Sequence, residues 1–158
     1  MTLKLQVVDP EVDLPAIAQC LFESYEDLPQ PSFHVFFPTH GTGEAARGAA
    51  IEEAAARLKL WNAHGKTMYW QKVTCFPDDG SRRFVEKALQ NHTRSRSQAA
   101  PRPHLYLFII FTHPDYRLQG VGQQFMNWGM KKADELGFDF YLDSTPYGRP
   151  LYEANGFR

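Results

Sequence analysis

The feature that most constrains the fold is an apolar run that ends at a proline and is soon followed by an amphipathic helix with two glycines at its start. Residues 104–112 read HLYLFIIFT and lie between Pro103 and Pro114. A continuous apolar run between such breakers predicts a strand that is buried on both faces. The segment GQQFMNWGMKKADELG then has apolar positions at helical spacing, and Gly137 should end the helix. This succession indicates the α/β or α+β class.

Other segments predict the rest of the architecture. Alternating or β-rich stretches predict strands at residues 3–8, 68–74 and 138–144. Helices are expected at residues 14–27, 44–62, 81–90 and 150–156. Asp13 can cap the first of these helices, and Pro15 suits its first turn. The segments 28–43 and 91–103 are rich in proline, glycine or polar residues, so we expect loops there.

The glycines Gly120 and Gly122 stand where the strand has ended and the helix begins. A helix N-terminus carries unpaired N–H groups and a partial positive charge, and glycine lets a ligand approach this backbone closely. Arg117 adds a cation nearby. We therefore expect the turn at residues 118–123 to bind a phosphate group, although a tight strand–helix connection is the alternative. Walker and dinucleotide motifs are excluded, because neither the required lysine nor a third glycine is present.

Two stretches resemble the GNAT superfamily of N-acetyltransferases. LFIIFTHPDYRLQGVGQQF is similar to that family's acetyl-CoA-binding segment, and RPLYEANGF is similar to its second signature near the C-terminus. The spacing between them fits one helix and one strand. The resemblance is strong over residues 104–157, weaker over residues 1–70 and absent over residues 74–103. It implies one N-acetyltransferase-like domain over residues 1–158, with a mixed, mainly antiparallel sheet flanked by helices.

The resemblance also implies roles for particular residues. The pantetheine arm and the thioester carbonyl would contact the backbone of Ile110, Phe111 and Thr112. The pyrophosphate would be held by Arg117, Leu118, Gln119, Gly120, Val121, Gly122 and Gln123. Tyr152 would protonate the departing sulfur of CoA, although an aromatic side chain in a final amphipathic helix can also be plain core. Asp143, at the end of the last strand, is a candidate base and equally a turn or cap residue.

The implied reaction is direct transfer of an acetyl group from acetyl-CoA to a primary amine within a ternary complex. The acceptor, a small amine or a peptide, stays open. Two departures from the family pattern predict an incomplete sheet: no partner strand is evident between residues 74 and 103, and no strand follows Phe157. This favours an alternative, in which the chain is a non-catalytic module that binds CoA or a partner.

Composition excludes several other classes. The net charge is −1 and the hydrophobic fraction is 43%, so a core can form and no basic excess invites nucleic acid. The 6 histidines and the 2 cysteines, Cys20 and Cys75, show no metal-ligand spacing, so we expect no metal and reduced thiols. No apolar run reaches membrane-spanning length, and the N-terminus lacks a secretory signal. We expect a cytoplasmic protein, with a nuclear location left open; nothing indicates the oligomeric state.

Overall fold

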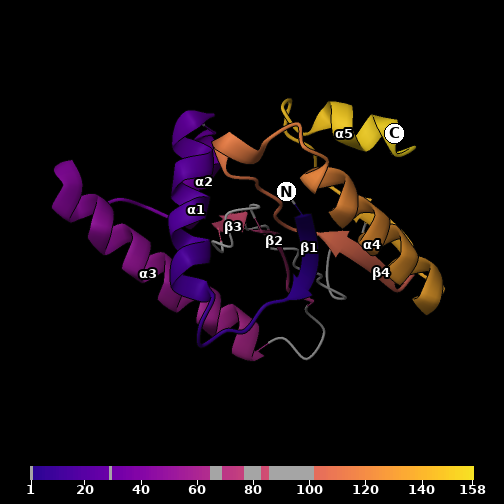
Figure 1. Cartoon of the computed structure of the whole chain (residues 1–158), viewed down its shortest axis with the longest axis horizontal. Coiled ribbons are helices and arrows are strands. Elements are labelled where there is room, and N and C mark those ends of the chain that lie inside the picture. Colours follow the sequence, from indigo (N-terminus) through magenta and orange to yellow (C-terminus); the bar gives the residue numbers. More distant parts are fainter. Residues whose placement is uncertain (1, 29, 65–68, 77–82, 86–101) are drawn as a thin grey trace.

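The computed structural model describes residues 2–28, 30–64, 69–76, 83–85 and 102–158 of the chain. In this part of the chain, three helices follow the first strand, three strands come next, and helices and one strand complete the chain (Figure 1). The elements, in chain order, are β1 (Thr2–Val7), α1 (Leu14–Asp27), α2 (Pro31–Phe36), α3 (Gly43–His64), β2 (Gln71–Phe76), β3 (Arg83–Val85), β4 (His104–Leu107), the 3-10 helix η1 (Pro114–Tyr116), α4 (Val121–Leu136), β5 (Asp139–Leu142) and α5 (Arg149–Ala154).

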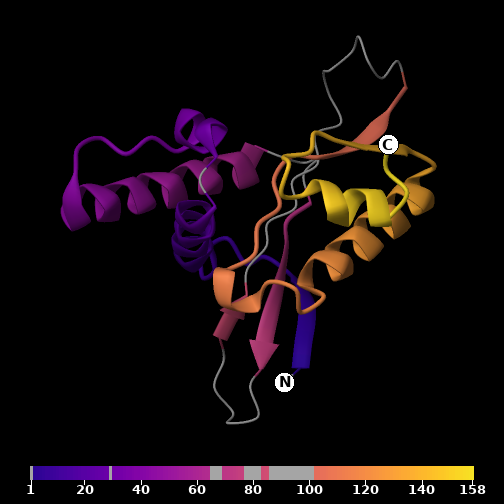
Figure 2. The same ribbon diagram turned by 90° about the horizontal axis from the view of Figure 1, so that it is seen from above.

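The strands form two sheets. β1, β2 and β3 make an antiparallel sheet in that order, with Leu5 opposite Val73. β4 and β5 pair in parallel, with Leu105 opposite Phe140, and α4 connects them as a βαβ unit. Figure 2 shows α1, α2 and α3 on one side of the strands and α4 and α5 on the other. The antiparallel and parallel strand pairs with helices on both sides confirm the predicted α/β (α+β) class.

Two hydrophobic clusters lie on the two sides of the strands. The first joins α1, α2 and α3 and contains Ile17, Leu21, Phe22, Phe33, Leu58 and Phe111. The second joins α4 and α5 to the strands and contains Val73, Leu107, Val121, Phe125, Met126 and Tyr152. Full burial of an apolar side chain of this size stabilises the fold by about 1.5–3 kcal/mol. The two clusters hold α1 and α5 in place, and the candidate site lies between these helices.

Most predicted elements are confirmed, and α4 matches best. The helix ends where Gly137 takes a left-handed conformation with φ +66°, and the N–H of Phe138 donates to the carbonyl of Ala133 at 3.0 Å. This pair of features is the usual glycine-terminated helix end. Phe125, Met126 and Ala133 are buried as their spacing predicted.

Three predictions about local structure were wrong. Residues 28–43 are not all loop, because Pro31–Phe36 forms α2. Arg83–Val85 forms strand β3 instead of part of a helix, since its backbone pairs with β2; this also supplies a strand between residues 74 and 103, where none was expected. The strand predicted at residues 104–112 ends at Leu107, because its parallel partner β5 ends opposite it at Leu142. The rest of the predicted 81–90 helix lies outside the described residues, except for Arg83–Val85, as does most of the 91–103 loop.

Asp13 precedes α1 as predicted, but its side chain makes no capping bond to the helix. Its Oδ2 accepts a hydrogen bond from the backbone N–H of Asp9 at 2.7 Å and forms an ion pair with Lys72 of β2. Both charged side chains are buried, with 1% of Asp13 and 5% of the Lys72 side chain exposed. The start of α1 is thus joined to the central strand β2 by a buried ion pair.

Candidate active site

An open cavity of about 230 Å³ lies at the carboxyl ends of the parallel strands β4 and β5. Ligands of α/β proteins commonly bind at this edge, because the connections leave a crevice beyond the strand ends. One wall consists of residues 107–112, which follow β4. The other walls are formed by Asp143, Thr145, Tyr147 and Gly148 after β5, by Ser24, Tyr25 and Leu28 of the α1 end, by Gln30, by Arg117, and by Leu151 and Tyr152 of α5.

The first wall of the cavity is formed by the chain segment that follows the end of β4. Beyond Leu107 the chain runs through residues 108–112 without belonging to any strand among the described residues. Phe111 turns its side chain into the cluster of α1, α2 and α3, whereas Leu107 belongs to the cluster of α4 and α5. The segment that contains Ile110, Phe111 and Thr112 therefore lines the cavity, but as irregular backbone instead of the predicted strand.

Asp143 lies at the end of β5, where it lines the cavity. The hydroxyl of Tyr106, on β4, donates a hydrogen bond of 2.6 Å to its Oδ2. Tyr106 and Tyr141 stand opposite each other in the parallel pair, so the register of β4 and β5 sets this contact. The bond orients the Asp143 carboxylate at the cavity wall.

Tyr152 belongs both to the hydrophobic core and to the cavity wall, so the two interpretations of this residue are compatible. It is 6% exposed, and its ring packs on Gly148, where an added Cβ would lie 2.8 Å from Cε2 of the tyrosine. Burial, and next the proximity of Tyr25, raise the pKa of Tyr152 above its usual value, and burial raises the pKa of Tyr25 to about 12. Both phenols therefore keep their protons at neutral pH.

The turn before α4 has an unusual backbone. Gly120, the N-cap residue, has φ +80°, and Leu118 has φ +58° although it is not a glycine. The Leu118 side chain is fully exposed, so packing does not explain this conformation. Left-handed backbone at a non-glycine residue costs about 1–2 kcal/mol, and such strain is concentrated at functional sites. Helix α4 begins directly after this turn. The backbone N–H groups of its first turn belong to Val121, Gly122 and Gln123.

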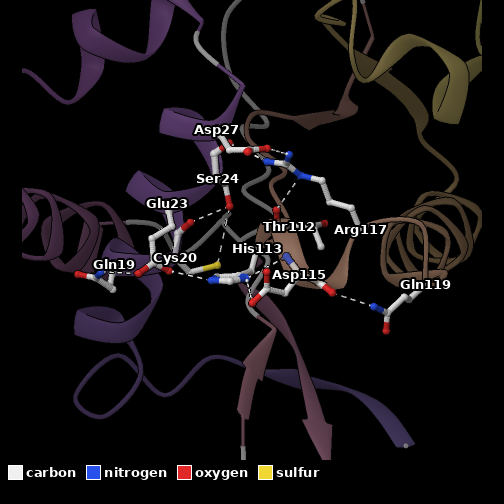
Figure 3. Close-up of polar contacts among 10 residues, drawn as sticks. All are labelled: Gln19, Cys20, Glu23, Ser24, Asp27, Thr112, His113, Asp115, Arg117 and Gln119. Carbon is white, nitrogen blue, oxygen red and sulfur yellow. Dashed lines mark hydrogen bonds and ion pairs between the residues drawn. The ribbon is translucent and has the colours of Figure 1, made fainter.

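Arg117 lies against the end of α1, as Figure 3 shows. Its guanidinium forms an ion pair with Asp27, donates to the carbonyl of Ser24 at 2.8 Å, and donates through Nε to the carbonyl of Thr112 at 3.4 Å. These contacts occupy the guanidinium and tie the turn before α4 to α1. They favour a role for Arg117 in positioning the turn over direct contact with a phosphate.

His113 strengthens the same connection (Figure 3). Its Nε2 lies 3.1 Å from Oε2 of Glu23 on α1, and its Nδ1 accepts a hydrogen bond of 3.2 Å from the N–H of Asp115. The described residues that line the cavity do not include His113. His113 therefore joins the turn before α4 to α1 and does not form part of the described cavity wall.

Several residues of the site were not found from the sequence. Tyr25 lies near the end of α1, but no sequence signal shows that this part of the helix reaches a cavity. Asn155 exchanges two side-chain hydrogen bonds with Gln123, at 2.6 and 3.0 Å, and so fixes the end of α5 to the first turn of α4. Phe108 and Gly148 also line the cavity. Contacts of this kind join residues far apart in sequence, so no local pattern predicts them.

Among the described residues, no three side chains of the His, Cys, Asp and Glu types gather in a way that could hold a metal ion. In the same part of the chain, no helix combines the length and the hydrophobicity needed to cross a membrane.

Comparison with known proteins supports the resemblance seen in the sequence. Residues 82–158 match the family model described as acetyltransferase (GNAT) domain. No curated protein matches the sequence significantly. The folds of several solved structures are similar over nearly the whole chain. The sequence match over residues 82–158 and the similar folds confirm the resemblance to the GNAT acetyltransferases.

Three of these structures illustrate the similarity. A GCN5-related N-acetyltransferase from Ralstonia eutropha JMP134 has a TM-score of 0.66 and 17% identity, with 99% of this chain and 93% of that chain covered. A predicted acetyltransferase with acetyl-CoA from Clostridium acetobutylicum has a TM-score of 0.66 and 12% identity, with 99% and 90% covered. Glucosamine-6-phosphate N-acetyltransferase from Arabidopsis thaliana has a TM-score of 0.61 and 12% identity, with 100% and 92% covered. At these identities the comparison supports the fold alone.

Proposed function

We propose that residues 1–158 form a single domain that transfers an acetyl group from acetyl-CoA to a primary amine. The observation that supports this best is the cavity itself. It collects Asp143, Tyr152 and the irregular backbone of residues 110–112, which are distant in sequence, at the carboxyl ends of β4 and β5. GNAT acetyltransferases use acetyl-CoA, so this co-substrate is the expected donor.

In this proposal the pyrophosphate of CoA binds at the N-terminus of α4. The N–H groups of Val121, Gly122 and Gln123 point out of the first helical turn, where the helix dipole favours an anion. Gly120 offers no side chain that would obstruct the approach, and Leu118 and Gln119 complete the turn. Arg117 holds the turn against α1. The pantetheine arm then runs along residues 110–112, whose backbone groups lie at the cavity wall.

The chemistry proposed for the cavity is a direct displacement. The amine nitrogen attacks the thioester carbonyl, a C–N bond forms and the C–S bond breaks. Asp143, oriented by Tyr106, accepts the proton that the attacking amine loses. Backbone N–H groups near residues 110–112 stabilise the oxyanion of the tetrahedral intermediate. Tyr152 gives its proton to the leaving sulfur, and solvent then restores the phenol.

The raised pKa of Tyr152 bears on the order of these events. An ordinary phenol, with a pKa of about 10, is already a weaker acid than a thiol, with a pKa of about 8.5. Burial makes the phenol weaker still. Complete proton transfer to a free thiolate is therefore uphill, and we expect the proton to move while the C–S bond breaks.

The alternative function, a non-catalytic CoA-binding module, was favoured by a missing strand. Strand β3 lies between residues 74 and 103, where no strand was expected. One of the two departures that favoured the alternative function is therefore removed. Release of CoA thiol from acetyl-CoA with a panel of primary amines separates the two functions. If the chain is an acetyltransferase, as we propose, the release of CoA thiol should depend on the amine and saturate with its concentration. Saturable binding of acetyl-CoA without release on any amine would instead identify a binding module.

The placement of the pyrophosphate can be tested at Gly120 with two substitutions of matched shape. Asp and Asn both tolerate left-handed backbone and both suit a helix N-cap, so Gly120→Asp and Gly120→Asn differ mainly in charge. No atom lies within 4 Å of a Cβ at this position, so neither side chain should clash. We expect Gly120→Asp to bind CoA at least about tenfold more weakly than Gly120→Asn, because of repulsion between anions. Calorimetric titration measures this difference. Equal affinities in the two variants would place the pyrophosphate elsewhere.

A further inference from the structure

We propose that the acceptor is a primary monoamine on an apolar, preferably aromatic, body. This inference rests on the proposed acetyltransferase activity and names the substrate class of the same cavity. According to this inference, polycations and phosphorylated sugars are not the preferred acceptors of this chain.

The first observation concerns the charged residues that line the cavity. Among the described residues that line the cavity, Asp143 and Arg117 are the charged ones. Each nitrogen of the Arg117 guanidinium already contacts the protein, through Asp27 and the carbonyls of Ser24 and Thr112. Asp143 supplies one carboxylate for one ammonium group. A phosphorylated acceptor needs a cation directed at it, and a polycation needs several carboxylates; this wall offers neither.

The second observation concerns the aromatic side chains at the cavity. Phe108 lines the cavity and is 36% exposed. Its ring meets the rings of Phe36, at 5.7 Å between centroids, and Trp61, at 5.8 Å, both edge to face. We call Phe36, Trp61 and Phe108 the aromatic rim. Phe36 is 44% exposed and Val35 beside it is also exposed, so an apolar surface continues from the cavity onto α2.

The third observation concerns the volume of the cavity. Its volume of about 230 Å³ is smaller than the 300–1,000 Å³ or so typical of pockets that enclose a drug-sized ligand. The same space must hold the acetyl thioester. Only the amine end of an acceptor therefore fits inside, and the rest of the molecule extends over the wall. A flat apolar body that leaves the cavity next to Phe108 would lie on the aromatic rim and lose its contact with water.

The test compares amines that differ in their bodies. Thiol release is measured with phenethylamine, ethylamine, kanamycin and glucosamine 6-phosphate at saturating acetyl-CoA. Phenethylamine differs from ethylamine only by the phenyl ring, and we expect its kcat/KM to be at least about tenfold higher. The kcat/KM values for kanamycin and for glucosamine 6-phosphate should both be lower than the value for phenethylamine.

Variants then show whether the aromatic rim causes this preference. Phe108→Ala should remove most of the advantage of phenethylamine over ethylamine, chiefly by raising KM, and Phe108→Tyr should keep it. Val12→Ala is the matched control, because Val12 is an exposed apolar residue outside the cavity wall and its loss should leave the ratio unchanged. Thermal melting checks that each variant is folded.

The failure of the inference and the failure of the proposed function give different results. A higher kcat/KM for kanamycin or glucosamine 6-phosphate would overturn the inference and leave the acetyltransferase activity standing. So would an unchanged preference in a folded Phe108→Ala variant. Thiol release with none of the amines, while acetyl-CoA still binds, would overturn both.

Discussion

Tyr152→Phe should lower kcat by about 10²–10⁴, the usual contribution of a positioned proton donor. The substitution keeps the ring and its contacts with Gly148 and the core, and removes only the hydroxyl. The raised pKa of Tyr152 means that the phenol still carries its proton at neutral pH, so the wild-type residue is in the form that can donate. The KM for acetyl-CoA should hardly change, because the lost interaction forms as the sulfur leaves. Steady-state kinetics with a reactive amine measures both parameters.

Two controls separate catalysis from packing at this position. Thermal melting of Tyr152→Phe should resemble that of the wild type, whereas Tyr152→Ala should destabilise the fold by about 3–5 kcal/mol through the cavity it leaves. Tyr25→Phe removes a second phenol, which is partly buried at the same cavity, and should lower the rate much less. A fully active Tyr152→Phe variant would remove Tyr152 from the mechanism and make water the proton source.

Asp13→Ala should lower the free energy of unfolding by about 3–5 kcal/mol, because it leaves the charge of Lys72 buried without this carboxylate. Both side chains are almost completely buried, so solvent can replace little of the lost interaction. The substitution also takes the acceptor from the N–H of Asp9. Urea denaturation at neutral pH measures the change. Because α1 carries Ser24 and Tyr25 of the cavity wall, we also expect weaker acceptor binding at temperatures where the variant is still folded.

The exposed ion pair between Lys59 and Glu11 provides the comparison, since it also connects the N-terminal segment to a helix. Glu11→Ala should change the unfolding free energy by no more than about 1 kcal/mol, as is usual for surface pairs. The double variant Asp13→Leu with Lys72→Met should be more stable than Asp13→Ala alone, because no charge is then left buried. A loss of less than 1 kcal/mol in Asp13→Ala would show that Lys72 finds other stabilisation.

Most of the helices were predicted from the sequence, with α2 as an exception, and α4 shows why. Its apolar spacing, its start after Gly120 and its end at Gly137 are local features, and each has a local physical cause in side-chain periodicity or backbone conformation. The turn that we propose to bind a phosphate is equally local, and Gly120 takes a left-handed conformation there. One family signature spans the turn and the start of α4 and the other spans α5, so local sequence was enough to indicate the resemblance.

The strands were predicted less well, because a strand exists only where a partner pairs with it. The apolar run at residues 104–112 marks buried chain correctly, but the end of β5 decides that β4 stops at Leu107. β3 has a helix-like sequence and becomes a strand through pairing with β2. Neither partner could be inferred from the segment itself.

The sequence by itself therefore determined most of the helices and the identities of the candidate residues Asp143 and Tyr152, and it indicated the turn at which we propose that an anion binds. Tertiary structure alone decided what surrounds them. It brought Tyr106 to Asp143, placed the Arg117 guanidinium on α1 instead of at the turn's open edge, and set the aromatic rim beside the cavity. Local patterns record the conformation that a segment prefers, whereas these contacts join residues tens of positions apart and form only when the two hydrophobic clusters pack on opposite sides of the strands.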